Sequence, residues 1–272
     1  MYSVILSYLH RSTSDLSSRL QYDQEVTTYS PDGRVFQVEY AEKASEKAGT
    51  AIGIRCVDGV VLGVEKTIIS KLLKPGANKR IEATDLYSAV VVSGFVPDGR
   101  SLANEAREAA AEYLDRYGSH IPGRILSDRI ASRVHTATIY WYERPFGCTL
   151  LLSTYDEEDG PSLYLIRPSG VCTRQFAAAI GRHRQGAKTE LEKIKFDQIT
   201  CVEAVKLIAM TMYKLHDDVK DKPFELELSW QCRETNYKVV PVPASIAEPA
   251  IAAAQEARRR ELMEDSDDDD DE

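Results

Sequence analysis

The sequence has few of the features that mark several large classes of protein. Its five cysteines lie at least 24 residues apart, without a CxxC pair. This excludes a zinc-ribbon framework and a secreted disulfide scaffold, and the cysteines are interpreted as small buried hydrophobes in a reducing compartment. No apolar run approaches the ~20 residues that a membrane helix needs. The five histidines form no HxxxH pair, and no phosphate-loop motif occurs. We therefore expect neither a metal nor a cofactor.

An excess of basic residues is also missing. The formal net charge is -9, but residues 264–272 alone carry eight carboxylates. The rest of the chain keeps 35 of the 43 acidic groups against 34 basic ones and is almost neutral. No basic stripe is present and the acidic end would repel phosphates, so a nucleic-acid partner is excluded.

Near the amino terminus, residues 30–41 form a stretch around which the rest of the chain can be described. Residues 30–33, Ser-Pro-Asp-Gly, have the composition of a tight turn. A helix is predicted directly after it, because Phe36, Tyr40 and Ala44 recur every four residues. Such a short helix is marginal alone, so we expect its apolar face to pack against another surface.

The later periodicity predicts clustered strands and clustered helices. Strands are predicted at 51–54, 60–64, 87–93, 146–153, 162–166 and 224–230, and helices at 102–113, 126–141, 181–195, 201–216 and 246–263. Asp58-Gly59 predicts a tight hairpin. Alternation in 224–230 predicts one solvated strand face. Pro145 is expected to end the helix before it, and Gly147 to admit a close approach. This order favours an α+β fold with helix pairs outside two facing sheets.

Six blocks in register resemble proteasome α-type subunits. They are the turn with its helix, GTAIGIRCVDGVVLGVEK (49–66), ERPFGCTLLL (143–152), RPSG (167–170), AIGRHRQGAKTELEK (179–193) and KDKPFELELSW (220–230). The resemblance covers roughly residues 22–245. With the acidic end, KDKPFELELSW is most similar to the branch at the seventh ring position. The resemblance implies a four-layer αββα sandwich of the N-terminal-nucleophile hydrolase type.

The resemblance also bears on catalysis. Proteolytic relatives expose a threonine as the first residue, whose α-amine acts as the base for its own hydroxyl. Alignment by eye places Gly49 at that position, Thr50 one step later and Arg80 near the supporting lysine. Glycine has no hydroxyl, so we predict no catalytic residue. A serine triad stays open, although no G-x-S-x-G motif supports one.

For a non-catalytic copy, the resemblance implies a place in the outer seven-membered ring of the proteasome core particle. The chain would gate substrate entry and dock regulatory particles in ubiquitin-dependent degradation, in cytoplasm and nucleus. Expected partners are neighbouring α subunits, β-ring subunits, activators and unfolded polypeptide. The family's gate positions carry Tyr22, Asp23, Pro31 and Tyr40 here. The alternative for each residue is a purely structural role, in which it only holds the turn and the helix together.

Two further expectations follow from the same alignment, and a third from the acidic end of the chain. Gln24 replaces the arginine that often follows the Tyr-Asp pair. Lys79 and Arg80 fall where a pocket between subunits offers a cation to an activator's terminal carboxylate; a solvated surface pair is the alternative. Ser266 precedes five aspartates, a setting that favours phosphorylation by acidophilic kinases.

The predicted organisation is one domain with tails. Residues 1–21 form an extension predicted to be disordered, 22–48 the gate segment and first helix, 49–245 the sandwich, 246–263 a last helix and 264–272 a disordered acidic tail. Two other functions are alternatives: an active threonine amidohydrolase, which would require processing to a new chain start, and a free-standing adaptor or chaperone.

Overall fold

The strands of this chain form two five-stranded antiparallel sheets. The computed structural model describes residues 22–269 except residue 75 and residues 218–220. The predicted extension 1–21 and the last three residues of the acidic tail therefore lie outside the described residues. The first sheet has the order β10-β9-β2-β1-β8, and the second the order β3-β4-β5-β6-β7.

The first sheet is built around strand β2. Its strands are β1 (Ala51–Arg55), β2 (Gly59–Thr67), β8 (Ala177–Ile180), β9 (Phe224–Cys232) and β10 (Val240–Pro241). Asp58-Gly59 joins β1 to β2 as predicted, and Ile52 pairs with Gly63 in the resulting register. Strand β9 pairs with β2 along the full length of both strands.

The second sheet has apolar runs in two neighbouring strands, VVV in β4 and LLL in β5. Its strands are β3 (Ile81–Asp85), β4 (Ser88–Gly94), β5 (Cys148–Asp156), β6 (Gly160–Ile166) and β7 (Cys172–Gln175). Val91 of β4 pairs with Leu151 of β5. β-Branched residues such as those of β4 suit a buried, pleated surface. The turn between β5 and β6 uses Gly160 at a φ of 66°, a conformation that glycine adopts without strain.

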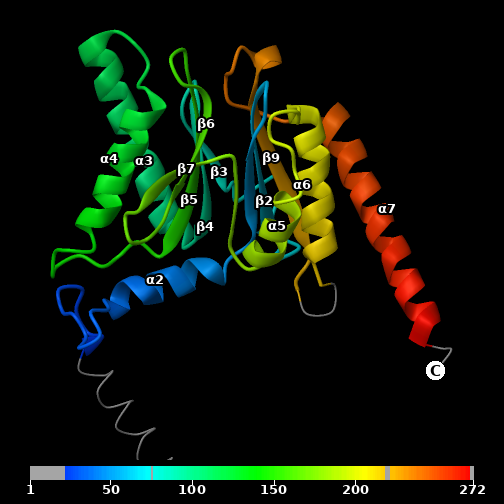
Figure 1. The fold of residues 1–272 in the computed structure, drawn as a ribbon, viewed down its shortest axis with the longest axis horizontal. Helices are drawn as coiled ribbons and strands as arrows, with labels where there is room; N and C mark the ends of the chain where they lie inside the picture. Colours follow the sequence, from blue (N-terminus) through cyan, green and yellow to red (C-terminus); the bar gives the residue numbers. More distant parts are fainter. Residues whose placement is uncertain (1–21, 75, 218–220, 270–272) are drawn as a thin grey trace, which may run out of the picture.

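Helices cover both outer faces of the paired sheets, as Figure 1 shows. Helices α3 (Val96–Tyr117) and α4 (Gly123–Thr136) pack on the second sheet, and α5 (Arg184–Leu191), α6 (Cys201–Leu215) and α7 (Ala244–Asp269) form the layer beside the first. Between the sheets, the buried core includes Val60, Leu62, Val91 and Leu151. The fold is the predicted α+β, four-layer αββα sandwich.

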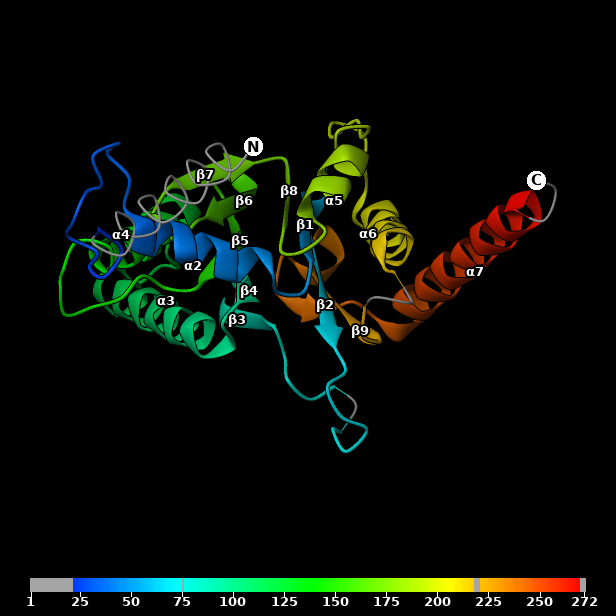
Figure 2. The ribbon, with the colours of Figure 1, turned by 90° about the horizontal axis from the view of Figure 1, so that it is seen from below.

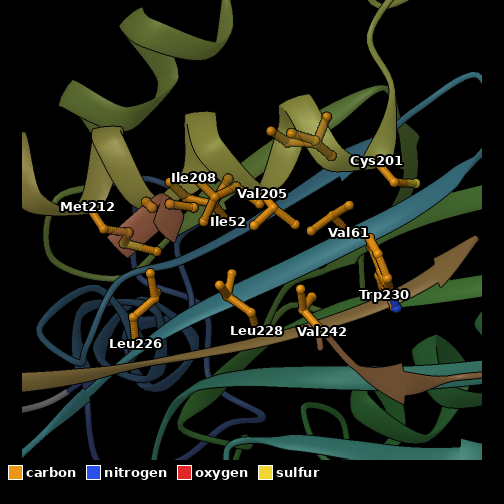
Figure 3. Packing of buried hydrophobic residues seen from close by; sticks show 14 of the residues in the cluster. Ile52, Val61, Cys201, Val205, Ile208, Met212, Leu226, Leu228, Trp230 and Val242 are labelled. Atoms are coloured by element: carbon orange, nitrogen blue, oxygen red, sulfur yellow. The ribbon is translucent and has the colours of Figure 1, made fainter. Parts of the chain in front are cut away.

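Helix α6 supplies much of the core outside the first sheet. Figure 3 shows Val205, Ile208 and Met212 in one row above Leu226 and Leu228 of β9. All five are buried in a single apolar cluster. Helix α6 begins with a capping box, in which Thr200 and Glu203 exchange side-chain-to-backbone hydrogen bonds.

The predicted solvated face of β9 is present only at its start. Glu225 is exposed, but Ser229 and Gln231 are buried. Ser229 and Gln231 pair with Leu62 and Val60 of β2 and so share the face that packs between the two sheets. The hydroxyl of Ser229 is satisfied by donating to the Val240 carbonyl oxygen at 2.9 Å.

Helix α2 (Phe36–Glu46) crosses one end of the second sheet, against β4 and β5, instead of lying on a face (Figures 1 and 2). Its buried residues are Phe36, Ala41 and Ser45, whereas Tyr40 is 39% exposed. The predicted apolar face is therefore confirmed at Phe36 and at Ala41 beside it, and wrong at Tyr40 and Ala44. The reason is that α2 buries the side chains that contact the strand ends beneath it. These need not be the side chains of its most regular apolar repeat.

Two predicted helix ends also differ. Helix α4 ends at Thr136 and not near Trp141, because the Thr138 hydroxyl donates to the His135 carbonyl oxygen at 2.6 Å and takes the chain out of the helix. Pro145 therefore does not end it. Helix α7 runs to Asp269, six residues into the stretch predicted to be a disordered tail. Once formed, a helix gains one backbone hydrogen bond for each residue it adds.

None of the helices in the described part of the chain combines the length and hydropathy that crossing a lipid bilayer requires.

Candidate functional site

The turn before α2 is closed by its own backbone. Ser30 donates its amide to the Arg34 carbonyl oxygen at 2.9 Å, and the Ser30 hydroxyl accepts the Arg34 amide at 3.0 Å. Gly33 donates to the Ser30 carbonyl oxygen at 2.8 Å and has a φ of 74°. Proline, aspartate and glycine meet the needs of this turn, so the predicted bend at 30–33 is confirmed.

Two of the four predicted gate residues meet at the outer end of α2. The Tyr40 hydroxyl lies 3.3 Å from a carboxylate oxygen of Asp23, to which it donates. The Gln37 side-chain amide donates to the backbone carbonyl of Asp23. The Phe36 and Tyr40 rings stack with centroids 6.3 Å apart. Helix α2 therefore fixes the segment that contains Asp23.

The structure does not join the other two predicted gate residues to this pair. Pro31 is exposed in the turn, and Tyr22 is half-buried. Within residues 22–269 as described, no hydrogen bond links Tyr22 or Pro31 to Asp23 or Tyr40.

Gly49, at the position of the family nucleophile, is enclosed by backbone. A Cβ atom at Gly49 would lie 2.5 Å from the Glu65 carbonyl oxygen, closer than real Cβ atoms approach. The Ser93 hydroxyl donates to the Gly49 carbonyl oxygen at 2.9 Å. A Cβ on Gly181 would lie 2.4 Å from the same oxygen, so the opposite wall also leaves no space. The site lacks a hydroxyl and has no room for a side chain.

Helix α2 closes this end of the sandwich from outside (Figure 2). The Thr149 hydroxyl of β5 donates to the Ser45 hydroxyl at 2.9 Å. The Arg182 amide donates to the Ala48 carbonyl oxygen at 2.9 Å. The chain ahead of Gly49 is thus bonded to both sheets and lies where a free chain start would have to be.

The structure also brings together Thr50, His183 and Asp221, an arrangement that sequence reasoning did not identify. The Thr50 hydroxyl oxygen lies 3.3 Å from His183 Nδ1, and His183 Nε2 lies 3.3 Å from Asp221 Oδ2. This order of groups is that of a hydrolase triad. However, Thr50 is only 1% exposed, and its hydroxyl oxygen accepts the His183 amide. A substrate carbonyl has no path to it, so the network is structural.

Asp221 holds this network to the loop before β9. It accepts a hydrogen bond from Arg182 and one from the Asp217 amide. Burial acts to raise the pKa of Asp221, but these two hydrogen bonds and the charge of Arg182 outweigh it and lower the pKa below its usual value. Asp221 is therefore an anion at neutral pH and anchors both Arg182 and His183.

Lys79 and Arg80 lie beside an acidic pair on β9. Lys79 is exposed, whereas Arg80 is half-buried and donates its amide to Glu227 at 3.0 Å. The buried Lys66 ammonium lies 3.3 Å from Glu225 and 3.6 Å from Glu227. Burial, and then the charge of Arg100, lower the pKa of the Arg80 guanidinium. Its Nε is buried and has no hydrogen-bond partner in the described chain.

The predicted corner at Arg144–Gly147 is an anionic clamp. Asp98 of α3 accepts two hydrogen bonds from the Arg144 guanidinium, at 2.6 and 2.8 Å, and one from the Gly147 amide at 2.8 Å. A Cβ on Gly147 would lie 2.5 Å from the Phe95 ring, so the predicted close approach is confirmed. The side chain of Ser266, the predicted phosphorylation site, lies outside what the structure describes.

Together these features define a class: a non-catalytic sandwich of the N-terminal-nucleophile hydrolase type, in which glycine and a preceding helix replace the reactive chain start. A family model described as "Proteasome subunit" matches residues 45–230. A second family model, which describes the N-terminal signature of A-type proteasome subunits, matches residues 22–44. The chain belongs to the proteasome subunit family, as an α-type, non-catalytic member.

Curated relatives agree with this assignment over most of both chains. The alpha type-3 proteasome subunit of Oryza sativa subsp. japonica is 51% identical over 236 residues, which is 87% of this chain and 94% of the relative. The protein of the same name from Arabidopsis thaliana is 50% identical with the same coverage. The probable alpha type-7 proteasome subunit of Saccharomyces cerevisiae is 44% identical and covers 86% of this chain and 83% of the relative.

Proposed function

We propose that this chain occupies one position in the outer seven-membered α ring of a proteasome core particle and there gates the entry of unfolded polypeptide. Its partners would be neighbouring α subunits, β-ring subunits and regulatory particles of ubiquitin-dependent degradation, in cytoplasm and nucleus. The observation that carries the proposal is the closure of the sandwich by α2. A chain that cannot cut, but presents a fixed helix and turn at one end, acts through its surfaces.

The outer end of α2 supports a role at a boundary between ring neighbours. Tyr40 is exposed despite its apolar ring, and it orients the Asp23 carboxylate. Tyrosine suits such a place because its ring packs while its hydroxyl bonds across to a wet surface. We infer that Tyr22, Asp23, Pro31 and Tyr40 contact equivalent residues of ring neighbours when the gate is open.

The gate is tested in assembled particles that contain substituted chains. Tyr40→Phe removes the hydroxyl that reaches Asp23 and keeps the ring. We expect lower activator-stimulated peptide hydrolysis and unchanged assembly, with a larger loss for Tyr40→Ala. Tyr117→Phe is the matched control, because Tyr117 is also exposed but lies at the end of α3. Full stimulation in the Tyr40→Phe particles would refute the role of this pair.

Lys79 and Arg80 are proposed to receive the carboxylate end of an activator tail. The exposed Lys79 and the half-buried Arg80 beside it support this, since a carboxylate accepts charge-assisted hydrogen bonds from such cations. Arg80→Ala should weaken binding of a carboxylate-ended activator peptide, while Arg100→Ala serves as a nearby cationic control. Equal affinity in both variants would favour the solvated-pair alternative.

Ser266 is proposed as a phosphorylation site for an acidophilic kinase, because five aspartates follow it directly. Phosphorylation would add about -1.5 to -2 charges to an already acidic end. Intact-mass measurement of the chain from native particles tests this modification, and Ser266→Ala identifies the position. The same measurement would reveal processing to a new threonine start, as the amidohydrolase alternative requires.

A further inference from the structure

A cluster of three potential metal ligands lies on the outer face of the first sheet, the face that is turned away from the second sheet. The sulfur atoms of Cys56 and Cys201 and a carboxylate oxygen of Asp58 all lie within 4.8 Å of one another. Both cysteines are almost completely buried, at 2% and 1% exposure, and Asp58 is half-buried. Neither thiol is in a disulfide.

The fold positions each of the three groups through its backbone. Cys56 directly follows β1, and its amide donates to the Gly59 carbonyl oxygen at 2.7 Å across the hairpin turn that contains Asp58. Cys201 is the first residue of α6. Figure 3 shows it at the end of the row formed by Met212, Ile208 and Val205.

Two hydrogen bonds tie the hairpin to the helix. Asp58 Oδ1 accepts the Cys201 amide at 2.9 Å, and the Val57 amide donates to the Ile199 carbonyl oxygen at 3.1 Å. The Asp58 backbone carbonyl also accepts the Arg233 amide at 3.0 Å. The three ligand groups therefore belong to a rigid junction of β1, β2 and α6.

From this junction we propose a binding site for a thiophilic divalent cation, Zn²⁺, ligated by Cys56, Cys201 and Asp58. Two thiolates and a carboxylate are a donor set that zinc accepts and that Mg²⁺ and Ca²⁺ do not select. With Zn–S bonds of about 2.3 Å in tetrahedral geometry, the two sulfurs would stand about 3.8 Å apart. That spacing needs no more than side-chain rotation from the present arrangement. Two thiol protons leave to solvent on binding.

Without the metal the thiols stay protonated: a hydrogen bond with Cys56, burial and the Asp58 charge raise the pKa of the Cys201 thiol, so the cation itself must displace the proton. The amino end of α6 carries a partial positive charge that stabilises nearby anions. The Arg233 charge acts on Asp58 from the other side. Two thiolates, one carboxylate and Zn²⁺ have a total charge of -1. The amino end of α6 and the Arg233 guanidinium would balance this charge. The half-buried side of Asp58 lets a water molecule complete the fourth position. Zinc would then hold the β1–β2 hairpin against α6.

Cobalt titration of the reduced, untagged full chain tests the site, because Co²⁺ substitutes for zinc and is visible. One equivalent should bind with a thiolate-to-cobalt charge-transfer band, and Zn²⁺ should displace it. Cys56→Ser and Cys201→Ser should each weaken binding by at least about 100-fold, since even loss of an outer-shell partner costs 10–100-fold. Asp58→Asn should weaken binding and keep the charge-transfer band.

Cys148→Ser is the matched control, because Cys148 is equally buried, at 2% exposure, but lies on β5. It should bind cobalt like the wild type. If the cluster variants fail to fold, X-ray absorption of the zinc-loaded wild type decides, with two sulfur neighbours at about 2.3 Å expected. A shell of only oxygen and nitrogen would overturn the proposal. So would binding unchanged by Cys56→Ser, or a Cys56–Cys201 disulfide without metal uptake.

Discussion

At the scale of the residue, the decisive feature is a glycine with no space around it. Gly49 lacks the hydroxyl of a nucleophile, and the Glu65 carbonyl oxygen would lie 2.5 Å from any Cβ placed there. Thr50, one position later, has a hydroxyl but is buried and already bonded to His183. Local packing thus removes both routes to catalysis at once.

Gly49→Thr should not create an active site. The added side chain would overpack the site against Glu65, and we expect the free energy of unfolding to fall by about 1–3 kcal/mol. Urea denaturation measures this loss. Ala257→Thr, on the half-buried side of α7, is the control: it should lower the free energy of unfolding only through helix propensity, by about 0.7 kcal/mol. A covalent adduct of a hydroxyl-directed inhibitor on the variant chain would contradict the prediction.

Asp98→Asn should destabilise the corner at Arg144–Gly147. Burial acts to raise the pKa of Asp98, but hydrogen bonds from Arg144 and the Gly147 amide outweigh it and lower the pKa. Losing charge-assisted hydrogen bonds should reduce the free energy of unfolding at pH 7 by about 2 kcal/mol. Arg144 is 64% exposed, so the part due to its charge should shrink as salt increases.

The same substitution has a defined pH dependence. Because the folded pKa of Asp98 is depressed, its contribution is fully present above the ordinary value of about 4 and is lost as the pH falls through the folded value. Wild type and Asp98→Asn should therefore converge in urea unfolding as the pH is lowered from 5 toward 2. A difference that stays constant over this range would show that the carboxylate charge is not responsible.

At the scale of the element, helix ends decide how the layers are fixed. Helix α6 starts at a capping box and next to the Asp58 carboxylate, so its first backbone amides are satisfied by side chains. Helix α2 has no side-chain cap and depends on contacts with β4 and β5. The same element type is thus held by local bonds in one case and by packing in the other.

Thr200→Ala should test the capping box of α6. Removing a cap of this kind costs about 1 kcal/mol, because the Glu203 amide loses its acceptor. Thr200→Ser keeps the hydroxyl and should stay close to wild type. Thermal and urea unfolding measure both variants. Equal loss in the two would mean that the methyl group, not the hydroxyl, provides the stabilisation.

At the scale of the whole molecule, the excess negative charge lies in a different part of the chain from the folded sandwich. The rest of the chain is almost neutral, and the excess of acidic residues lies in residues 264–272 at the carboxyl end. Figure 2 shows the carboxyl-terminal part of α7 extending away from the two sheets. Acidic side chains at a helix carboxyl end interact unfavourably with the helix dipole.

Deleting residues 264–272 should therefore leave the fold unchanged. The deletion removes eight carboxylates and takes the formal net charge from -9 to -1. We expect the free energy of unfolding to change by no more than about 0.5 kcal/mol, as for surface changes in general. Ion-exchange elution should shift strongly in the same samples. A stability loss above that limit would indicate contacts between this end and the sandwich.

The size of the native species separates a ring component from a free adaptor. In native extract we expect the chain to elute from size-exclusion columns with a large particle. A pool at the size of a single chain would instead favour the adaptor or chaperone alternative.

The sequence alone determined the clustering of strands and helices, the bend at 30–33 and the missing hydroxyl at Gly49, but its predicted strands did not include β3, β7, β8 and β10. The determined features follow from local periodicity, from turn chemistry and from residue type, which act over a few neighbouring positions. It also pointed to Asp23 and Tyr40, through the resemblance of the amino-terminal stretch. The apolar pattern did not predict where α4 ends, which the Thr138 hydroxyl decides, or which side chains of α2 are buried.

Only the tertiary structure decided which distant residues meet. Thr50 contacts His183, and Cys56 approaches Cys201, across more than 130 residues of sequence in each case. No short motif announces such contacts, since they depend on the order of strands in the first sheet and on where α5 and α6 begin. The outward position of Tyr40 has the same origin: helix periodicity defines a stripe, but the surface that α2 crosses selects the side chains it buries.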